Sequence, residues 1–240
     1  MQSSYREYRP PLGLAQVVAC LWESNPTVDR MQRIVPDGCV DLIWFAEHEL
    51  VIAGADAGPR VVELPAGMWS SGIRLRPGAA GAVLRRPASE IRNHQVDAAL
   101  VWGAETVRLR EALRLAAPSQ RLGLLADAVA RRKSEPDVLV VEAAQRLATP
   151  GARVAVVAAD LGVSERQLHR RTLAGVGYGP KMLGRVARLR RLVSLGGEYS
   201  LGARAIDAGY ASQAHMSAEV LRLTGATPVR FLKDATLTAA

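Results

Sequence analysis

The 240-residue sequence is poor in cysteine, histidine and aromatic residues, and each shortage excludes a class of protein. Two cysteines, Cys20 and Cys39, are too few for a disulfide framework or a four-cysteine zinc site. In the first half, His48 and His94 lie far apart in sequence and lack the spacing of paired metal ligands. We therefore expect no metal, no cofactor and no enzyme activity of the metal-dependent kind.

Long apolar runs are also missing. No stretch approaches the roughly 18 residues that a membrane helix needs, and no basic start leads into a hydrophobic signal core. We therefore expect a cytoplasmic protein with reduced thiols and no membrane partner.

Cys39 stands near Asp37 and Asp41, which disfavour the thiolate, so a buried structural cysteine is favoured over a reactive one.

Basic residues are in excess and unevenly distributed. The net charge is +8, from 31 basic and 23 acidic residues. Residues 136–240 alone hold 14 basic and 8 acidic residues. Between residues 165 and 191 there are eight Lys or Arg and one acid, Glu165. A solvated face explains many such runs, but this imbalance favours neutralisation of phosphates.

The same basic region contains a repeated pattern. Residues 158–164 and 205–212 carry equivalent glycines, Gly162 and Gly209, 47 positions apart. Each copy predicts a short helix, a glycine turn and a second helix capped by a serine, Ser164 or Ser212. This arrangement is a helix-turn-helix, and two copies in one chain indicate binding to duplex DNA.

Apolar residues at helical spacing support the helix-turn-helix interpretation. Val154, Val157, Ala158 and Leu161 recur at helical spacing in the first unit, and a helix from Pro180 to about residue 193 joins the two units. The candidate DNA contacts are the polar or outward residues of the second helix in each unit: Ser164, Arg166, Gln167, His169, Arg170, Arg171, Ser212, Gln213, Ala214, His215, Ser217 and Arg222. The first set is the more basic.

Residues 137–234 resemble the DNA-binding domain of AraC-type (AraC/XylS) transcription regulators. The resemblance rests on residues 158–168, on the linker helix that ends near residues 192–193, on residues 206–210 (Ile-Asp-Ala-Gly-Tyr) and on the closing residues 224–231. It implies an all-α domain of about seven helices, whose recognition helices near 165–173 and 213–223 enter successive major grooves, roughly 34 Å apart. It further implies base contacts from Arg166, His169 and Arg170, and from Ser212, Gln213 and Ala214. The resemblance also allows two further partners, RNA polymerase and a second copy of the chain.

The sequence departs from this family at three positions. Ala218 stands where the family usually has arginine, and Thr172 and Val220 stand where it usually has phenylalanine. We therefore expect the first recognition helix to carry more of the affinity and base readout than the second.

The first half has a different pattern. Short apolar or alternating runs, broken by Gly, Pro and Asp, predict antiparallel strands near 14–22, 30–35, 40–45, 50–53, 61–64 and 72–75. Helices are predicted at 79–85, 105–116 and 120–133. The resulting division is an α+β domain at 1–133, a linker at 134–136 and the DNA-binding domain at 137–240.

Residues 33–42 and 72–80 resemble the sensor domain, a small antiparallel β-barrel of cupin-like kind, that precedes AraC-type DNA-binding domains. The resemblance implies a domain that binds an effector, mediates self-association, or both. Charged residues alternate with apolar ones in the predicted strands, so they face either solvent or a barrel interior. One interpretation is a stabilising Asp–Arg pair or a solvated face. The other is an effector pocket built from Trp22, Glu23, Asp41, Trp44, Arg74 and Arg76, with Trp69 as a further wall.

We therefore predict an effector-responsive, sequence-specific transcription regulator. One alternative is a DNA-binding protein whose N-terminal domain only associates with other protein chains. A second is an enzyme fused to a DNA-binding domain.

Overall fold

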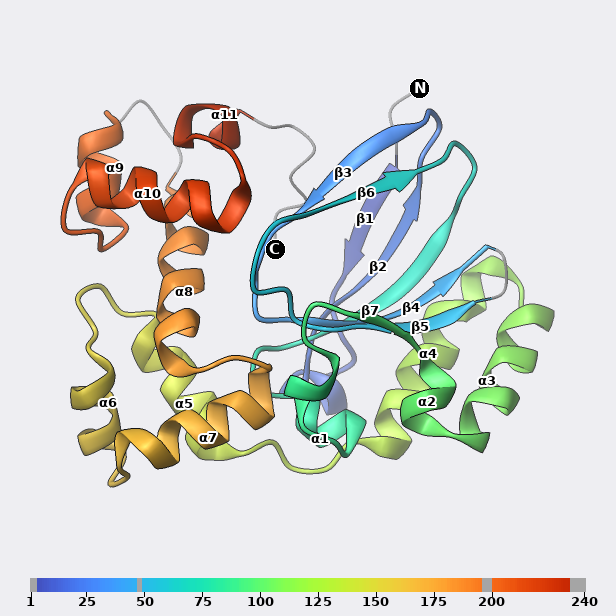
Figure 1. The fold of residues 1–240 in the computed structure, drawn as a ribbon. Coiled ribbons are helices and arrows are strands. Elements are labelled where there is room, and N and C mark those ends of the chain that lie inside the picture. Colours follow the sequence, from blue (N-terminus) through green and yellow to red (C-terminus); the bar gives the residue numbers. More distant parts are fainter. Residues whose placement is uncertain (1–3, 47–48, 196–199, 234–240) are drawn as a thin grey trace.

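The computed structural model describes residues 4–46, 49–195 and 200–233. The N-terminal part combines antiparallel strands with short helices, and the C-terminal part is entirely helical (Figure 1). The predicted fold class, an α+β domain followed by an all-α domain with two helix-turn-helix units, is confirmed. His48, weighed above as a metal ligand, lies outside the described residues.

The N-terminal strands form two antiparallel sheets. The larger has the order β1-β2-β7-β4-β5-β8 and the smaller pairs β3 with β6. Their bounds are β1 Ser4–Tyr8, β2 Val18–Asn25, β3 Arg30–Ile34, β4 Val40–Phe45, β5 Leu50–Ala53, β6 Arg60–Leu64, β7 Ser70–Leu75 and β8 Gln95–Asp97. The six predicted strands are all present, but β1 and β8 were not predicted. The predicted strand at 14–22 begins only at Val18, because residues 12–14 form a 3-10 turn, η1 (Leu12–Leu14).

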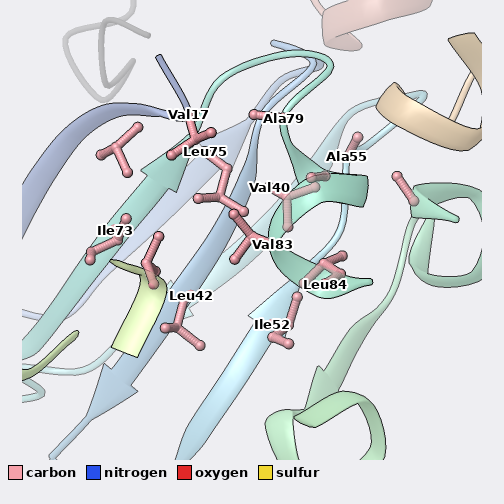
Figure 2. Close-up of a cluster of buried hydrophobic side chains, with 14 of the residues drawn as sticks. Val17, Val40, Leu42, Ile52, Ala55, Ile73, Leu75, Ala79, Val83 and Leu84 are labelled. Carbon is pink, nitrogen blue, oxygen red and sulfur yellow. The ribbon is translucent and has the colours of Figure 1, made fainter. Parts of the chain in front are cut away.

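The alternation along β4 separates the two faces of the larger sheet. Val40, Leu42 and Trp44 are buried in the main hydrophobic core, whereas Asp41 and Ile43 point to the opposite side. Helices cover the core face: α1 (Ala80–Leu84), α2 (Ala98–Trp102), α3 (Ala104–Leu115) and α4 (Pro118–Arg132), with the 3-10 turn η2 (Ala88–Ile91). Figure 2 shows side chains of β4, β5 and β7 meeting Val83 and Leu84 of α1 in this core.

The described C-terminal residues form seven helices. They are α5 (Val138–Leu147), α6 (Val154–Asp160), α7 (Glu165–Val176), α8 (Pro180–Ser194), α9 (Leu201–Asp207), α10 (Gln213–Thr224) and α11 (Pro228–Leu232). In Figure 1, α8 stands between the pair α6 and α7 at one end and the pair α9 and α10 at the other. The predicted linker helix is therefore present and separates the two units.

The two units differ in how they join the N-terminal part. Helix α7 packs against η2 and α1, and Leu168 and Val176 belong to the same core as the larger sheet. The second unit has a separate core around Met216, Val220 and Phe231. The first unit is thus fixed to the N-terminal part by buried apolar surface.

The described residues contain neither a membrane-spanning helix nor a metal-binding cluster of side chains. No helix among them has the length and hydrophobicity needed to cross a lipid bilayer. No group of three or more His, Cys, Asp or Glu side chains in the same ranges is placed to hold a metal ion.

Candidate DNA-binding surface and N-terminal cavity

The first helix-turn-helix unit consists of α6 and α7. Gly162, with φ of 67°, occupies the left-handed region in the turn, which a residue with a Cβ adopts only with strain. Ser164 caps α7: its hydroxyl accepts a hydrogen bond from the Gln167 amide at 3.2 Å. The Gln167 side chain in turn accepts one from the Ser164 amide at 2.9 Å. This capping box fixes the start of the first recognition helix.

The exposed face of α7 carries three arginines and a histidine. Arg166 and Arg170, one turn apart, are exposed on this helix. Arg171 instead donates to Asp137 at 2.8 Å, and Asp137 also caps α5. His169 is exposed, but its ring lies against Gly179, where a β-carbon would come within 2.5 Å of Cε1. Arg166 and Arg170 are therefore the side chains of this face that are best placed to reach a partner.

The second unit consists of α9 and α10 and repeats this design. Gly209 has φ of 88°, and the Ser212 hydroxyl caps α10 by accepting from the His215 amide at 3.1 Å. The His215 ring is partly exposed and is held at both nitrogens: Nδ1 accepts from the Ala211 amide at 3.2 Å and Nε2 lies 3.5 Å from Glu219. It also meets Tyr210 edge to face. His215 therefore shapes the turn, and Gln213 and Ala214 form the exposed start of the helix.

Two further DNA-contact candidates lie on the remainder of α10. Ser217 is half-buried and Arg222 is exposed in the last turn of the helix. The start of α10 has no exposed cation to compare with Arg166 and Arg170 in α7. This difference agrees with the expected inequality of the two units.

A cavity of about 340 Å³ lies between the larger sheet and the β3–β6 pair. Trp22 forms part of its floor, because Gly72 leaves room for the indole: a β-carbon on Gly72 would come within 2.4 Å of the ring. Tyr5 lies beside Trp22, with ring centroids 6.0 Å apart. Apolar side chains of both sheets and of the loop between β6 and β7 complete the walls: Ile34, Ile43, Phe45, Val62 and Leu64 from the sheets and Met68 from the loop.

A buried polar cluster occupies one side of the cavity. Asp41 accepts hydrogen bonds from the Trp22 indole at 2.9 Å and from Arg74 at 3.3 Å. Burial raises the pKa of Asp41, while Arg74 acts in the opposite direction, and Asp41 is the main cause of the raised pKa of Arg74. Burial likewise raises the pKa of Cys39 well above its usual value and that of Cys20 to about 11. Both thiols are therefore protonated at neutral pH and serve as small packing groups.

The family comparisons cover both parts of the chain. Residues 6–97 match a domain of unknown function (DUF6597), and residues 157–234 match a helix-turn-helix domain. The C-terminal part therefore contains a helix-turn-helix domain, the kind of domain that its resemblance to AraC-type regulators implies. Its two capped units and the linker helix α8 are the features on which the resemblance in sequence rested.

Solved structures of ToxT, from the bacterium Vibrio cholerae, are similar to this chain. ToxT of Vibrio cholerae O395 is 12% identical, with 94% of this chain and 98% of that chain covered and a TM-score of 0.47. Unsaturated fatty acid bound wild-type ToxT from Vibrio cholerae strain SCE256 is 11% identical, with 100% and 93% covered and a TM-score of 0.43. No curated protein matches the chain.

Within the helix-turn-helix domain, two arginines of α8 have a structural role that the sequence did not reveal. Arg185 and Arg188 lie 3.1 Å and 2.9 Å from the carboxylate of Glu219, which is 8% exposed on α10. Arg188 also lies over the Tyr210 ring. These two arginines, counted above as part of a phosphate-binding face, instead tie α8 to the second recognition helix.

The structure brings together only three of the six predicted pocket residues. Trp22, Asp41 and Arg74 line the cavity. Three others lie elsewhere: Trp44 is buried in the core under the helices, Glu23 accepts from Tyr8 at the surface, and Arg76 donates to the Ala15 carbonyl. Trp69 packs against the core, with Arg121 stacked 3.8 Å from its ring centre. Strand alternation explains why Trp44 and Glu23 lie outside the cavity. Trp44 is on the opposite face of β4 from Asp41, and Glu23 is on the opposite face of β2 from Trp22.

The smaller sheet supplies cavity residues that sequence reasoning missed. Arg30 and Gln32 of β3 and Arg60 of β6 line the cavity, and Arg60 pairs with the buried Asp56 at 3.4 Å. Arg30 and Gln32 stand at alternate positions of a predicted strand, which is the signal that marks them as sharing a face.

Proposed function

We propose that the chain is a sequence-specific, DNA-binding transcription regulator that places α7 and α10 in successive major grooves. The observation that carries this proposal is a pair of serine-capped recognition helices, joined by α8, with Arg166 and Arg170 exposed on the first. Arg170 is suited to bidentate contact with a guanine and Gln213 to contact with an adenine. Its place of action is then the cytoplasm of a bacterium, and its function is regulatory rather than enzymatic.

We further propose that the N-terminal cavity binds a small-molecule effector. Ligand sites in proteins are usually mostly apolar with a few polar groups, and this cavity has that composition. Arg30 supports an effector with an acceptor or anionic group, because its buried Nε lacks a hydrogen-bond partner within the described part of the chain. The aromatic floor of Trp22 and Tyr5 suits a flat or apolar body.

Selection of bound sequences from a random duplex pool tests DNA binding by the full chain. Footprinting on the selected operator should show two protected stretches about one helical turn apart. The double variant R166A/R170A is expected to lose the first stretch. An unprotected selected operator, or equal affinity for random DNA, contradicts the proposal.

Thermal-shift screening of the full chain tests the effector site, since α7 shares the core of the N-terminal part. Stabilisation by a small aromatic or aliphatic acid that is lost in the variants R30Q and G72V supports the cavity. Stabilisation that survives both variants places the ligand elsewhere.

A second candidate role for the N-terminal part is self-association. Leu100 of α2 and Val107 and Leu115 of α3 are 71%, 64% and 71% exposed, and they offer apolar surface to a second chain. Light scattering distinguishes the roles: a dimer that the variant V107E converts to a monomer, with no stabilising small molecule, favours association. RNA polymerase is a further partner for the same regulator.

A further inference from the structure

The two recognition helices are attached to the N-terminal part in different ways. Helix α7 is fixed through a continuous hydrophobic core with α1 and η2. Helix α10 packs against α8, α9 and α11 and meets the N-terminal part at its C-terminal end. Its direct contact with the N-terminal part is therefore much smaller, and its other attachment is to α8, whose Leu183 and Val186 belong to the main core.

The centre of that direct contact is Arg33. Its Nη1 atom donates a hydrogen bond of 2.9 Å to the main-chain carbonyl of Thr224, the last residue of α10. The C-terminal end of a helix carries partial negative charge on carbonyls that lack a partner within the helix, so a guanidinium is favourable there. Such a hydrogen bond from an ionised donor is stronger than one between neutral groups.

Neighbouring residues fit closely around this hydrogen bond. Gly225 ends α10 in the left-handed region, with φ of 68°. A β-carbon there would lie 3.4 Å from Arg33 Nη1 and 3.5 Å from Pro59 Cγ. Val35 packs against the core of the second unit. The ends of β3 and β6 thus hold the C-terminal end of α10 from the N-terminal side.

The same segment lines the cavity. Arg33, Ile34, Val35, Asp37 and Cys39 are all among its walls. We propose that Arg33 is a positioning residue for the second recognition helix, through which the cavity wall sets how α10 meets DNA. The proposal rests on the DNA-binding function above, and it assigns control to the second half of the operator.

The geometry of α10 explains why a contact at one end affects the other. A 12-residue helix is about 18 Å long, and the exposed contact candidates Gln213 and Ala214 lie at the end opposite Arg33. A small tilt at Thr224 therefore displaces them from the groove. This tilt does not move helix α7, because α7 is attached through the hydrophobic core that it shares with the N-terminal part.

The experiment uses the full chain and its selected operator. The half-sites are first assigned by the loss of footprint in R170A for α7 and in Q213A for α10. Operators with either half-site scrambled are then titrated at fixed salt with the wild type, R33A and R33K. R33A should bind the intact operator about three- to tenfold more weakly, the loss expected for one typical intramolecular hydrogen bond. It should bind the operator with a scrambled second half-site as the wild type does.

The controls separate positioning from general damage. R33K keeps the positive charge and should recover part of the second footprint. R86A removes an exposed arginine that lies outside the cavity and pairs with Glu90 at 3.5 Å, and it should leave the second footprint intact. If R33A unfolds, as circular dichroism would show, the comparison is made with R33K, which should show a weakened second footprint and an unchanged first. Equal losses on both half-sites, or no loss, overturn the proposal. A wild type without two footprints overturns the DNA-binding function itself.

Discussion

Glu219 of α10 accepts a hydrogen bond from Arg188 of α8 at 2.9 Å, and the pair joins the second recognition helix to the helix that links the two units. Arg185 binds the other carboxylate oxygen at 3.1 Å. Glu219 is 8% exposed, so removal of its charge leaves two arginines facing a neutral, buried group. An acid held in this way is a structural residue of the second helix-turn-helix unit.

Replacement of Glu219 by glutamine should destabilise the protein by about 2 kcal/mol, because a largely buried ion pair costs more to break than a surface one. The free energy of unfolding in urea measures this effect. The matched control is E142Q, which breaks a pair between Glu142 and Arg146 that is 40% exposed on each side. That change should cost less than about 1 kcal/mol. Equal losses would show that the Glu219 cluster has no special role.

Arg170 should contribute base readout, whereas its neighbour Arg171 should not. Replacement of Arg170 by alanine is expected to weaken specific binding by about 1–3 kcal/mol and to relax the preference at one base pair. R171A is the matched control, because Arg171 is held by Asp137 at 2.8 Å. It should change specific and random binding alike. Titration of the operator and of random DNA at one salt concentration measures both, and unchanged operator affinity of R170A contradicts the assignment.

Gly72 should be indispensable to the cavity floor. A β-carbon there would overlap the Trp22 ring at 2.4 Å, so G72A should destabilise the protein by about 1–3 kcal/mol through overpacking. G58A is the matched control, since no atom lies within 4 Å of the added carbon. Denaturant unfolding of both variants decides the matter: a loss in G58A as large as in G72A would mean that steric overlap with Trp22 is not the cause.

The hydroxyl of Ser164 should stabilise α7 as a cap. S164A is expected to lose about 1 kcal/mol, the usual contribution of such a cap. S119A, which changes an exposed serine in the first turn of α4, should be nearly neutral. If unfolding experiments find the two variants equally stable, the capping box of α7 is energetically unimportant.

Local signals in the sequence predicted much of this architecture. The strand at Val40–Phe45 and the caps Ser164 and Ser212 follow from patterns within a few residues, and the structure has all of them. The placement of Trp44 in the pocket was wrong for an avoidable reason. Trp44 shares its alternation with Val40 and Leu42, which marks it as a core residue once Asp41 is assigned to the cavity.

Other parts of the site depend on contacts between distant residues. The pairing of β3 with β6, which gives the cavity its second wall, joins Arg30 to Leu64 across the chain. The hydrogen bond from Arg33 to Thr224 spans 191 positions. No local pattern encodes such pairings. The role of Arg188 was also hidden, because an arginine on an exposed-looking helix face has the same sequence pattern whether it meets phosphate or Glu219.

The ion pairs that anchor the two recognition helices have opposite polarity. Arg171 and Glu219 each stand seven residues after the capping serine, yet the first pairs with an acid and the second with two arginines. An exchange of α7 and α10 between the units would therefore bring Arg171 against Arg185 and Arg188, and Glu219 against Asp137. Helices α7 and α10 are therefore not interchangeable, because the ion pairs that hold them, as well as their exposed side chains, fix which helix belongs to which unit.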